Sequence, residues 1–215
     1  MDDPVKQVAS LIIERAVRSQ PFLVGVGGGV AAGKSTFAAN LATELAGRDL
    51  AAQVVSLDGY LKSNAALQAA GLAHRKGFPE SFDVVRLVGD VAQMRAGRPV
   101  RVRGYDHAAN DVVDALTPVE SGGILILEGV IALAPQLAKL LHLKVFLDTD
   151  LEVARARYQE RVLRVAAQDP EHPLNTVPHE HRLSVLNAVW VEVNLRNFTD
   201  HIAPARDVAD VVVAF

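Results

Sequence analysis

A glycine-rich segment constrains this chain more than any other feature of its sequence. Residues 28–35 read GGVAAGKS, which fits the pattern G-x-x-x-x-G-K-[ST]. The short apolar run 22–26 precedes this segment, and the helical stripe of Phe37, Leu41 and Leu45 follows it. Such an order of strand, loop and helix lets successive backbone N–H groups converge on one anion in front of a helix dipole. The sequence therefore predicts a phosphate-binding loop.

The residue types of this loop each suit phosphate binding. Glycine lets the backbone curl, Lys34 can reach the β- and γ-phosphates of a nucleotide, and the Ser35 hydroxyl can ligate Mg²⁺. The alternative is a glycine-rich turn with a surface lysine, but a chance match in a chain of this length occurs on the order of 1% of the time. The predicted nucleotide-binding residues are Gly28, Gly29, Val30, Ala31, Ala32, Gly33, Lys34, Ser35 and Thr36.

The rest of the chain alternates between strand-like and helix-like patterns. Besides 22–26, apolar runs predict strands at 54–57, 124–127, 144–147 and 208–213. Apolar residues at helical spacing predict helices at 5–12, 37–45, 84–91, 151–167 and 183–193. This alternation indicates an α/β fold of the P-loop NTPase type, with a mostly parallel β-sheet covered by helices on both faces. At 215 residues, we expect 1–215 to form a single domain.

Composition excludes several functional classes. With 22 basic and 25 acidic residues the formal net charge is −3, so we expect no nucleic-acid partner and no membrane-surface patch. The chain contains no cysteine, which excludes disulfides, thiolate metal sites and a cysteine nucleophile. The longest apolar tract, 124–134, is interrupted by Glu128 and is too short to span a bilayer. A cytoplasmic protein is the expectation.

Two carboxylates follow predicted strands. Asp58 comes directly after the strand 54–57, and Glu128 comes directly after 124–127. In parallel sheets, ligands bind beyond the carboxyl ends of the strands. Asp58 is therefore a candidate base for a hydroxyl acceptor, although Asp-Gly is also a common turn pair. Glu128 is a candidate magnesium ligand together with Ser35, against the alternative of a helix cap or an ion-pair partner.

From Asp58 onward, the chain resembles the family of P-loop kinases that includes type I pantothenate kinase, uridine/cytidine kinase and phosphoribulokinase. The likeness lies in DGYL at 58–61, RKGFPESFD at 75–83, GYDH at 104–107 and YQER at 158–161. Near the C-terminus it continues at Trp190, Asn194, Asn197, Ile202 and Pro204. The resemblance covers about 22–213, and the string KGFPES is closest to type I pantothenate kinase.

This resemblance implies a role for individual residues. Asp58 would be the base and Lys34 and Arg161 would be the further catalytic residues, with Arg161 clamping the transferred phosphate. Tyr105, His107 and Asn194 would be the acceptor contacts. Each of these residues also has a structural alternative. Tyr105 could be a partly buried aromatic residue, His107 a solvated loop histidine and Asn194 a polar residue on a helix surface. Arg161 could belong to a charged helix face that it shares with Arg155, Arg157 and Arg164.

The chain also departs from the pantothenate kinases that it resembles. It is shorter, and Arg103-Gly104 replaces the Val-Pro that precedes the family's acceptor tyrosine. The stretch 169–181, with three prolines and three histidines, does not match; we interpret it as a connection or a lid, because no spacing fits a zinc motif.

The sequence thus predicts an ATP- and Mg²⁺-dependent phosphotransferase that acts on the hydroxyl of a small metabolite. Pantothenate is the first candidate acceptor, and uridine, cytidine or a sugar is the alternative. Two other classes stay open: a regulatory P-loop NTPase, although the N-K-x-D motif of GTPase switches is missing, and a catalytically inactive paralogue that binds nucleotide. The family likeness also implies a homo-oligomer, a homodimer or a tetramer.

Overall fold

The centre of the molecule is a five-stranded sheet in the order β2-β5-β1-β6-β7, in which every neighbouring pair is parallel. The computed structural model describes residues 3–16, 20–120 and 122–214. The strands are β1 Phe22–Gly28, β2 Ala52–Ser56, β5 Ile124–Glu128, β6 Leu143–Asp148 and β7 Val211–Ala214. All five strands expected from the sequence are present within a few residues of their predicted bounds. The α/β fold class is confirmed.

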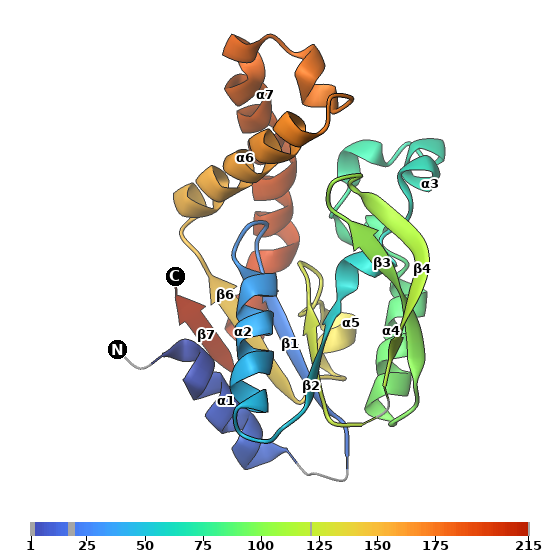
Figure 1. The fold of residues 1–215 in the computed structure, drawn as a ribbon, viewed down its shortest axis with the longest axis vertical. Coiled ribbons are helices and arrows are strands. Elements are labelled where there is room, and N and C mark those ends of the chain that lie inside the picture. Colours follow the sequence, from blue (N-terminus) through green and yellow to red (C-terminus); the bar gives the residue numbers. More distant parts are fainter. Residues whose placement is uncertain (1–2, 17–19, 121, 215) are drawn as a thin grey trace.

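Helices cover both faces of this sheet (Figure 1). On β1, Val24 and Val26 belong to an apolar cluster with α1 and α2, whereas Leu23 belongs to a second cluster with α4. This division follows from the strand geometry, because successive side chains of a strand point to opposite faces. The helices are α1 Pro4–Arg15, α2 Lys34–Ala46, α3 Asn64–Ala69, α4 Val84–Arg95, α5 Pro135–Ala138, α6 Leu151–Gln168 and α7 Arg182–Val189.

The start of α4 is defined by a side-chain cap. Asp83 is the N-cap, and its carboxylate accepts a hydrogen bond from the Arg86 backbone N–H at 3.1 Å. Ser81 is fully buried instead. Its hydroxyl accepts from the Gly77 N–H at 3.0 Å and donates to the Phe78 carbonyl at 2.7 Å, so it stabilises the turn that precedes the helix.

A β-hairpin beside the main sheet was not predicted. Its strands, β3 Val100–Asp106 and β4 Asp111–Val119, pair antiparallel, with a register shift at Arg103 and Gly104. Most of β4 is exposed, so its sequence lacks the alternation of apolar and polar residues by which a strand is recognised. The hairpin carries the GYDH motif, and Figure 1 shows it beside α3 and α4.

The helices between β6 and β7, including α6 and α7, extend past the carboxyl ends of the strands (Figure 1). The stretch 169–181 connects α6 to α7 and contains two short 3-10 turns, Pro173–Thr176 and His179–His181. Its Leu174 packs with Ala166 and Leu186 in a small cluster of its own. After α7 the helix continues through wider turns, Trp190–Leu195 and Phe198–Ile202, beyond the predicted end at 193. Across the residues described, no helix has the length and apolarity needed to cross a membrane.

Gly59 lets the hairpin approach the end of β2. A Cβ at this position would lie 2.0 Å from the carbonyl oxygen of Arg103 and 3.1 Å from Val102 Cγ1. We therefore expect Gly59→Ala to lower the free energy of unfolding by about 1–3 kcal/mol, because the hairpin backbone must shift.

Urea denaturation measures this change, and Gly89→Ala is the matched control. Gly89 lies on an exposed position of α4, where no described atom is within 4 Å of an added Cβ. There the same substitution should stabilise the protein by about 0.4–1 kcal/mol. Equal effects at the two positions would contradict the close-approach explanation.

Candidate active site

The loop 29–33 joins β1 to α2 and has the backbone shape of a phosphate cradle. Gly28 has φ +145°, and a Cβ there would lie 2.7 Å from the Leu147 carbonyl oxygen. Gly33, the residue before α2, has φ +89°, in the left-handed region that favours glycine. Among the described residues no side chain caps α2, so its first N–H groups remain available to an anion.

Lys34 begins α2 and folds back over the loop. Its ammonium donates a hydrogen bond to the Gly29 carbonyl at 2.7 Å, and only 9% of the residue is exposed. Burial lowers the pKa of Lys34, while the nearby carboxylates of Glu128 and Asp58 act in the opposite direction. The lysine is therefore held next to both predicted carboxylates.

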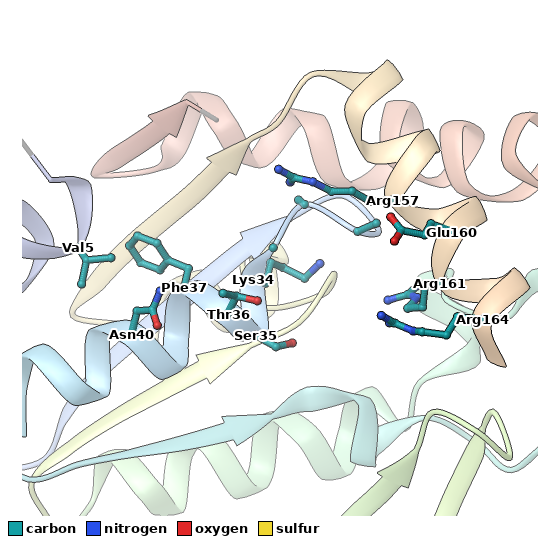
Figure 2. A pocket seen from close by; sticks show the side chains of 13 residues that line it. Val5, Lys34, Ser35, Thr36, Phe37, Asn40, Arg157, Glu160, Arg161 and Arg164 are labelled. Carbon is teal, nitrogen blue, oxygen red and sulfur yellow. The ribbon is translucent and has the colours of Figure 1, made fainter. Parts of the chain in front are cut away.

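A cavity of about 540 Å³ opens between this loop and α6. Figure 2 shows the side chains of Arg157, Glu160 and Arg161 extending from α6 toward the loop, opposite Lys34 and Ser35. Arg164 lines the same cavity, whereas Arg155 forms an ion pair with Glu152. The structure thus brings the predicted clamp, Arg161, to the predicted phosphate site. It also adds two arginines that the sequence interpretation had assigned only to a charged helix face.

Glu128 ends β5 and lies beside the loop. Only 5% of the residue is exposed, and the side chains of Ser56 and Ser35 are hydrogen-bond partners of its carboxylate. Burial raises the pKa of Glu128, and the charge of Asp58 raises it further. A buried carboxylate paired with a hydroxyl is a donor set that suits Mg²⁺, which binds through one or two protein oxygens and keeps several waters. Ser35 and Glu128 therefore fit the expected magnesium site.

Asp58 lies in a 3-10 turn, Leu57–Tyr60, directly beyond β2. The Ser56 hydroxyl starts this turn by accepting from the Asp58 N–H at 3.4 Å. β2 pairs with β5 so that Ser56 lies opposite Glu128, which places Asp58 next to the phosphate site. The Asp-Gly pair does form a tight turn, and the aspartate within it is charge-coupled to Lys34.

Tyr105 and His107 lie together on the hairpin. Their rings meet edge to face at 5.1 Å, and the Tyr105 hydroxyl donates to Asn110 Oδ1 at 2.8 Å. Burial raises the pKa of Tyr105, and the carboxylates of Asp58 and Asp111 raise it further. Two of the three predicted acceptor contacts are therefore adjacent, and Tyr105 lies close enough to the predicted base for the charge of Asp58 to act on it.

Asn194 occupies a different place. It lies in the wide helical turn Trp190–Leu195, beside Tyr158, and lines a small cavity with Gly29 and Phe198. The structure does not bring it to Tyr105 or His107. Its role as an acceptor contact stays a prediction.

Three residues of the site were not singled out from the sequence. Arg157 and Arg164 lie four residues before and three residues after Arg161, which is the helical spacing that places them on the same face. That spacing was a usable signal. The third, Lys76, belongs to the RKGFPES string, and its contacts with the hairpin are long-range ones that no local pattern encodes.

The loop, the base position and the α6 arginines together define a phosphate-transfer site of the P-loop class. The profile of the phosphoribulokinase / uridine kinase family matches residues 23–168. The chain therefore belongs to this family, and the expected activity class, a small-molecule kinase, is confirmed.

Several curated relatives are pantothenate kinases. The enzyme of Lactiplantibacillus plantarum is 32% identical over 97% of this chain and 72% of its own length. The enzyme of Parvibaculum lavamentivorans is 33% identical over 96% of this chain and 70% of its own length. The resemblance inferred from KGFPES is thus confirmed over most of the chain, which is shorter than these relatives.

Solved structures show the same fold. A kinase provisionally assigned to a fructose transport system of Silicibacter sp. TM1040 superposes with a TM-score of 0.79 at 23% identity, covering 99% of this chain and 100% of its own. A D-glycerate 3-kinase of Cryptococcus neoformans gives a TM-score of 0.66 at 12% identity, covering 94% and 89%. At these identities the likeness supports the fold alone.

Proposed function

We propose that this chain transfers the γ-phosphate of ATP, bound with Mg²⁺, to a hydroxyl of a small metabolite, with pantothenate as the first candidate acceptor. The observation that carries the proposal is the juxtaposition of Asp58 with Lys34 and Glu128 at one edge of the sheet, facing the arginines of α6. The identity of about one third to pantothenate kinases supports the choice of acceptor.

Each residue has a distinct part in this proposal. Asp58 accepts the proton of the acceptor hydroxyl as the oxygen attacks phosphorus. Lys34 and Arg161 bind the phosphate oxygens, on which charge is spread in the transition state. Ser35 and Glu128 would hold the magnesium ion, which would supply positive charge to neutralise the phosphate oxygens. Tyr105 and His107 orient the acceptor through hydrogen bonds.

A nucleoside or sugar acceptor is the second candidate. Arg103-Gly104 occupies the place of the family's Val-Pro pair, and the Arg103 guanidinium donates to the Leu61 carbonyl at 2.8 Å next to the Asp58 turn. This contact lies on the acceptor side of the proposed site, where a difference from the family would bear on the choice of acceptor. The phosphate and base roles are the same under either candidate.

A coupled ADP-release screen with ATP and Mg²⁺ against pantothenate, uridine, cytidine and a panel of sugars tests the proposal. Stimulation by pantothenate supports the first candidate, and stimulation by a nucleoside or sugar instead supports the second. ADP release that no acceptor stimulates would contradict a metabolite kinase and favour a regulatory NTPase.

The raised pKa of Glu128 predicts a pH dependence of magnesium binding. Protons and Mg²⁺ compete for this carboxylate, and burial together with Asp58 favours the protonated form. The ionised form is therefore lost at a higher pH than for an exposed glutamate, whose pKa is about 4.3. We expect the Mg²⁺-dependent affinity for nucleotide to decrease as the pH is lowered, and this decrease should begin at a pH above about 4.3. A higher Mg²⁺ concentration should shift the decrease to lower pH.

Titration of a fluorescent ATP analogue at several Mg²⁺ concentrations and pH values measures this effect. Glu128→Gln should bind nucleotide more weakly, and without the acidic fall that depends on Mg²⁺. A fall of the same position and size in the variant would show that another group titrates.

A further inference from the structure

We propose that Lys76 is a positioning residue that fastens the turn of the β3–β4 hairpin and thereby fixes Tyr105 and His107 beside Asp58. The inference rests on the proposed function in one respect, namely that the hairpin residues contact the acceptor. It also assigns a role to the RKGFPES segment, which takes no part in the proposed phosphate binding or proton transfer.

The hairpin turn is tied to the rest of the protein at Asn64 and Lys76. The Lys76 ammonium donates to the Asn64 side-chain oxygen at 2.6 Å and to the main-chain carbonyl of Asn110. The Asn64 amide donates to the same carbonyl at 3.1 Å, and the Asn64 N–H donates to Asp111 Oδ1 at 3.0 Å. Three hydrogen bonds therefore converge on two consecutive residues of the turn.

The turn passes this constraint to the proposed acceptor residues. Asn110 has φ +49°, a left-handed conformation that a non-glycine residue keeps when its surroundings hold it. In that conformation its side-chain oxygen accepts from the Tyr105 hydroxyl, and the Lys76 ammonium lies 5.3 Å from the Tyr105 ring centre. The Tyr105 ring in turn packs against His107. A continuous line of contacts thus runs from Lys76 to both residues.

Lys76 is also set on a rigid base. The next residue, Gly77, has φ +91°, and its carbonyl accepts from the Asn197 amide of the C-terminal helix at 2.8 Å. Phe78 is fully buried, with the Arg75 guanidinium 3.5 Å from its ring centre. The lysine therefore projects from a backbone that is itself held in place, which is what a residue needs in order to position a turn.

The carboxylates of Asp111 and Asp58 favour the charged form of the Lys76 side chain. Burial lowers the pKa of Lys76, and the charges of Asp111 and then Asp58 counteract this by favouring the charged form. Hydrogen bonds from a charged donor are about twice as strong as neutral ones. Two of the three ammonium protons are used by Asn64 and Asn110, so the geometry favours positioning over a direct contact with the acceptor.

Hydrogen–deuterium exchange of the segment 106–111 tests the inference without any acceptor. We expect Lys76→Met to speed exchange there by about 3- to 10-fold, the effect of losing a hydrogen bond, with other segments unchanged. Lys76→Arg keeps a charged donor and should restore most of the protection. Lys62→Met is the matched control, because Lys62 donates to the Glu80 carbonyl at 3.0 Å and does not contact the hairpin.

Kinetics with whichever acceptor stimulates ADP release adds a second readout. Lys76→Met should raise the KM for that acceptor about 10-fold or more and leave the KM for ATP unchanged, and Lys76→Arg should reverse most of this. If Lys76→Met fails to fold, Asn64→Ala takes its place, because it removes the bond from Lys76 to the Asn64 side chain and the bond from the Asn64 amide to the Asn110 carbonyl.

The outcomes separate the inference from the proposed function. Unchanged exchange at 106–111 in Lys76→Met overturns the inference, even with a raised KM, because that pair of results means a direct contact with the acceptor. Faster exchange throughout the chain also overturns it, since the lysine would then be a general structural residue. Faster exchange confined to the hairpin, with no acceptor found in the screen, supports the inference while the proposed function fails.

Discussion

Asp58→Asn is expected to lower kcat with the acceptor by about 10²- to 10⁴-fold and to leave the affinity for ATP and Mg²⁺ nearly unchanged. Asparagine has almost the same size, so the 3-10 turn and its contact with Ser56 are kept, but the amide cannot take the proton of the acceptor hydroxyl. Steady-state ADP release gives kcat, and titration of a fluorescent ATP analogue gives the affinity.

Asp114→Asn is the control for this substitution. Asp114 is exposed on β4 of the same hairpin and should leave kcat unchanged. Because Asp58 also raises the pKa of Glu128, both variants should be compared with the parent on the plateau of the pH profile. Full turnover in Asp58→Asn would rule out the base assignment while leaving the phosphate site intact.

The sequence predicts best those features that depend on residues adjacent to one another in the chain. The central strands β1, β5 and β6 are short apolar runs because both of their faces are covered, and the phosphate loop is a contiguous motif between a strand and a helix. Asp58 and Glu128 follow from the same logic, since each comes at the carboxyl end of a strand. The position of a residue in the chain was enough to place it.

The hairpin shows where that logic ends. β4 is exposed along most of its length, so the sequence carries no apolar alternation, and the hairpin is located by contacts with distant residues. Gly59 is a second example. The pair Asp58-Gly59 predicts a turn, but the crowding that requires glycine comes from the Arg103 carbonyl, 44 residues further along the chain. Asn194 is a third, because it lies on a helix whose position relative to the hairpin no spacing encodes.

The RKGFPES string combines both kinds of information. From the sequence it indicated a family, and in the structure its residues join three elements: Lys76 contacts the hairpin turn, Gly77 contacts the C-terminal helix, and Ser81 stabilises the turn before α4. A string with these tasks is required by the architecture whatever the acceptor is. Its likeness to pantothenate kinases is therefore stronger evidence for the scaffold than for the substrate.

Arg161→Gln is the second substitution for which we expect a large effect, a loss of about 10²–10³ in kcat. Arg161 extends from α6 into the cavity opposite Lys34, and its charge lowers the pKa of that lysine, so the two cations act on the same space. Charge spreads over the equatorial oxygens of the phosphoryl group in the transition state, and a planar guanidinium can bind two of them. The neutral amide of glutamine cannot replace this, whereas lysine should retain part of the rate.

The same helix supplies the control for Arg161. Arg155 is one helical turn and a half away, is bound to Glu152 and does not line the cavity, so Arg155→Gln should leave kcat unchanged. Single-turnover phosphate transfer separates the chemical step from product release, which a lid helix can also limit. A slowed chemical step in Arg161→Gln, with nucleotide affinity changed only modestly, is the expected result. Equal losses in Arg161→Gln and Arg155→Gln would mean that α6 contributes only its general positive charge, and the assignment of Arg161 as a specific clamp would then fail.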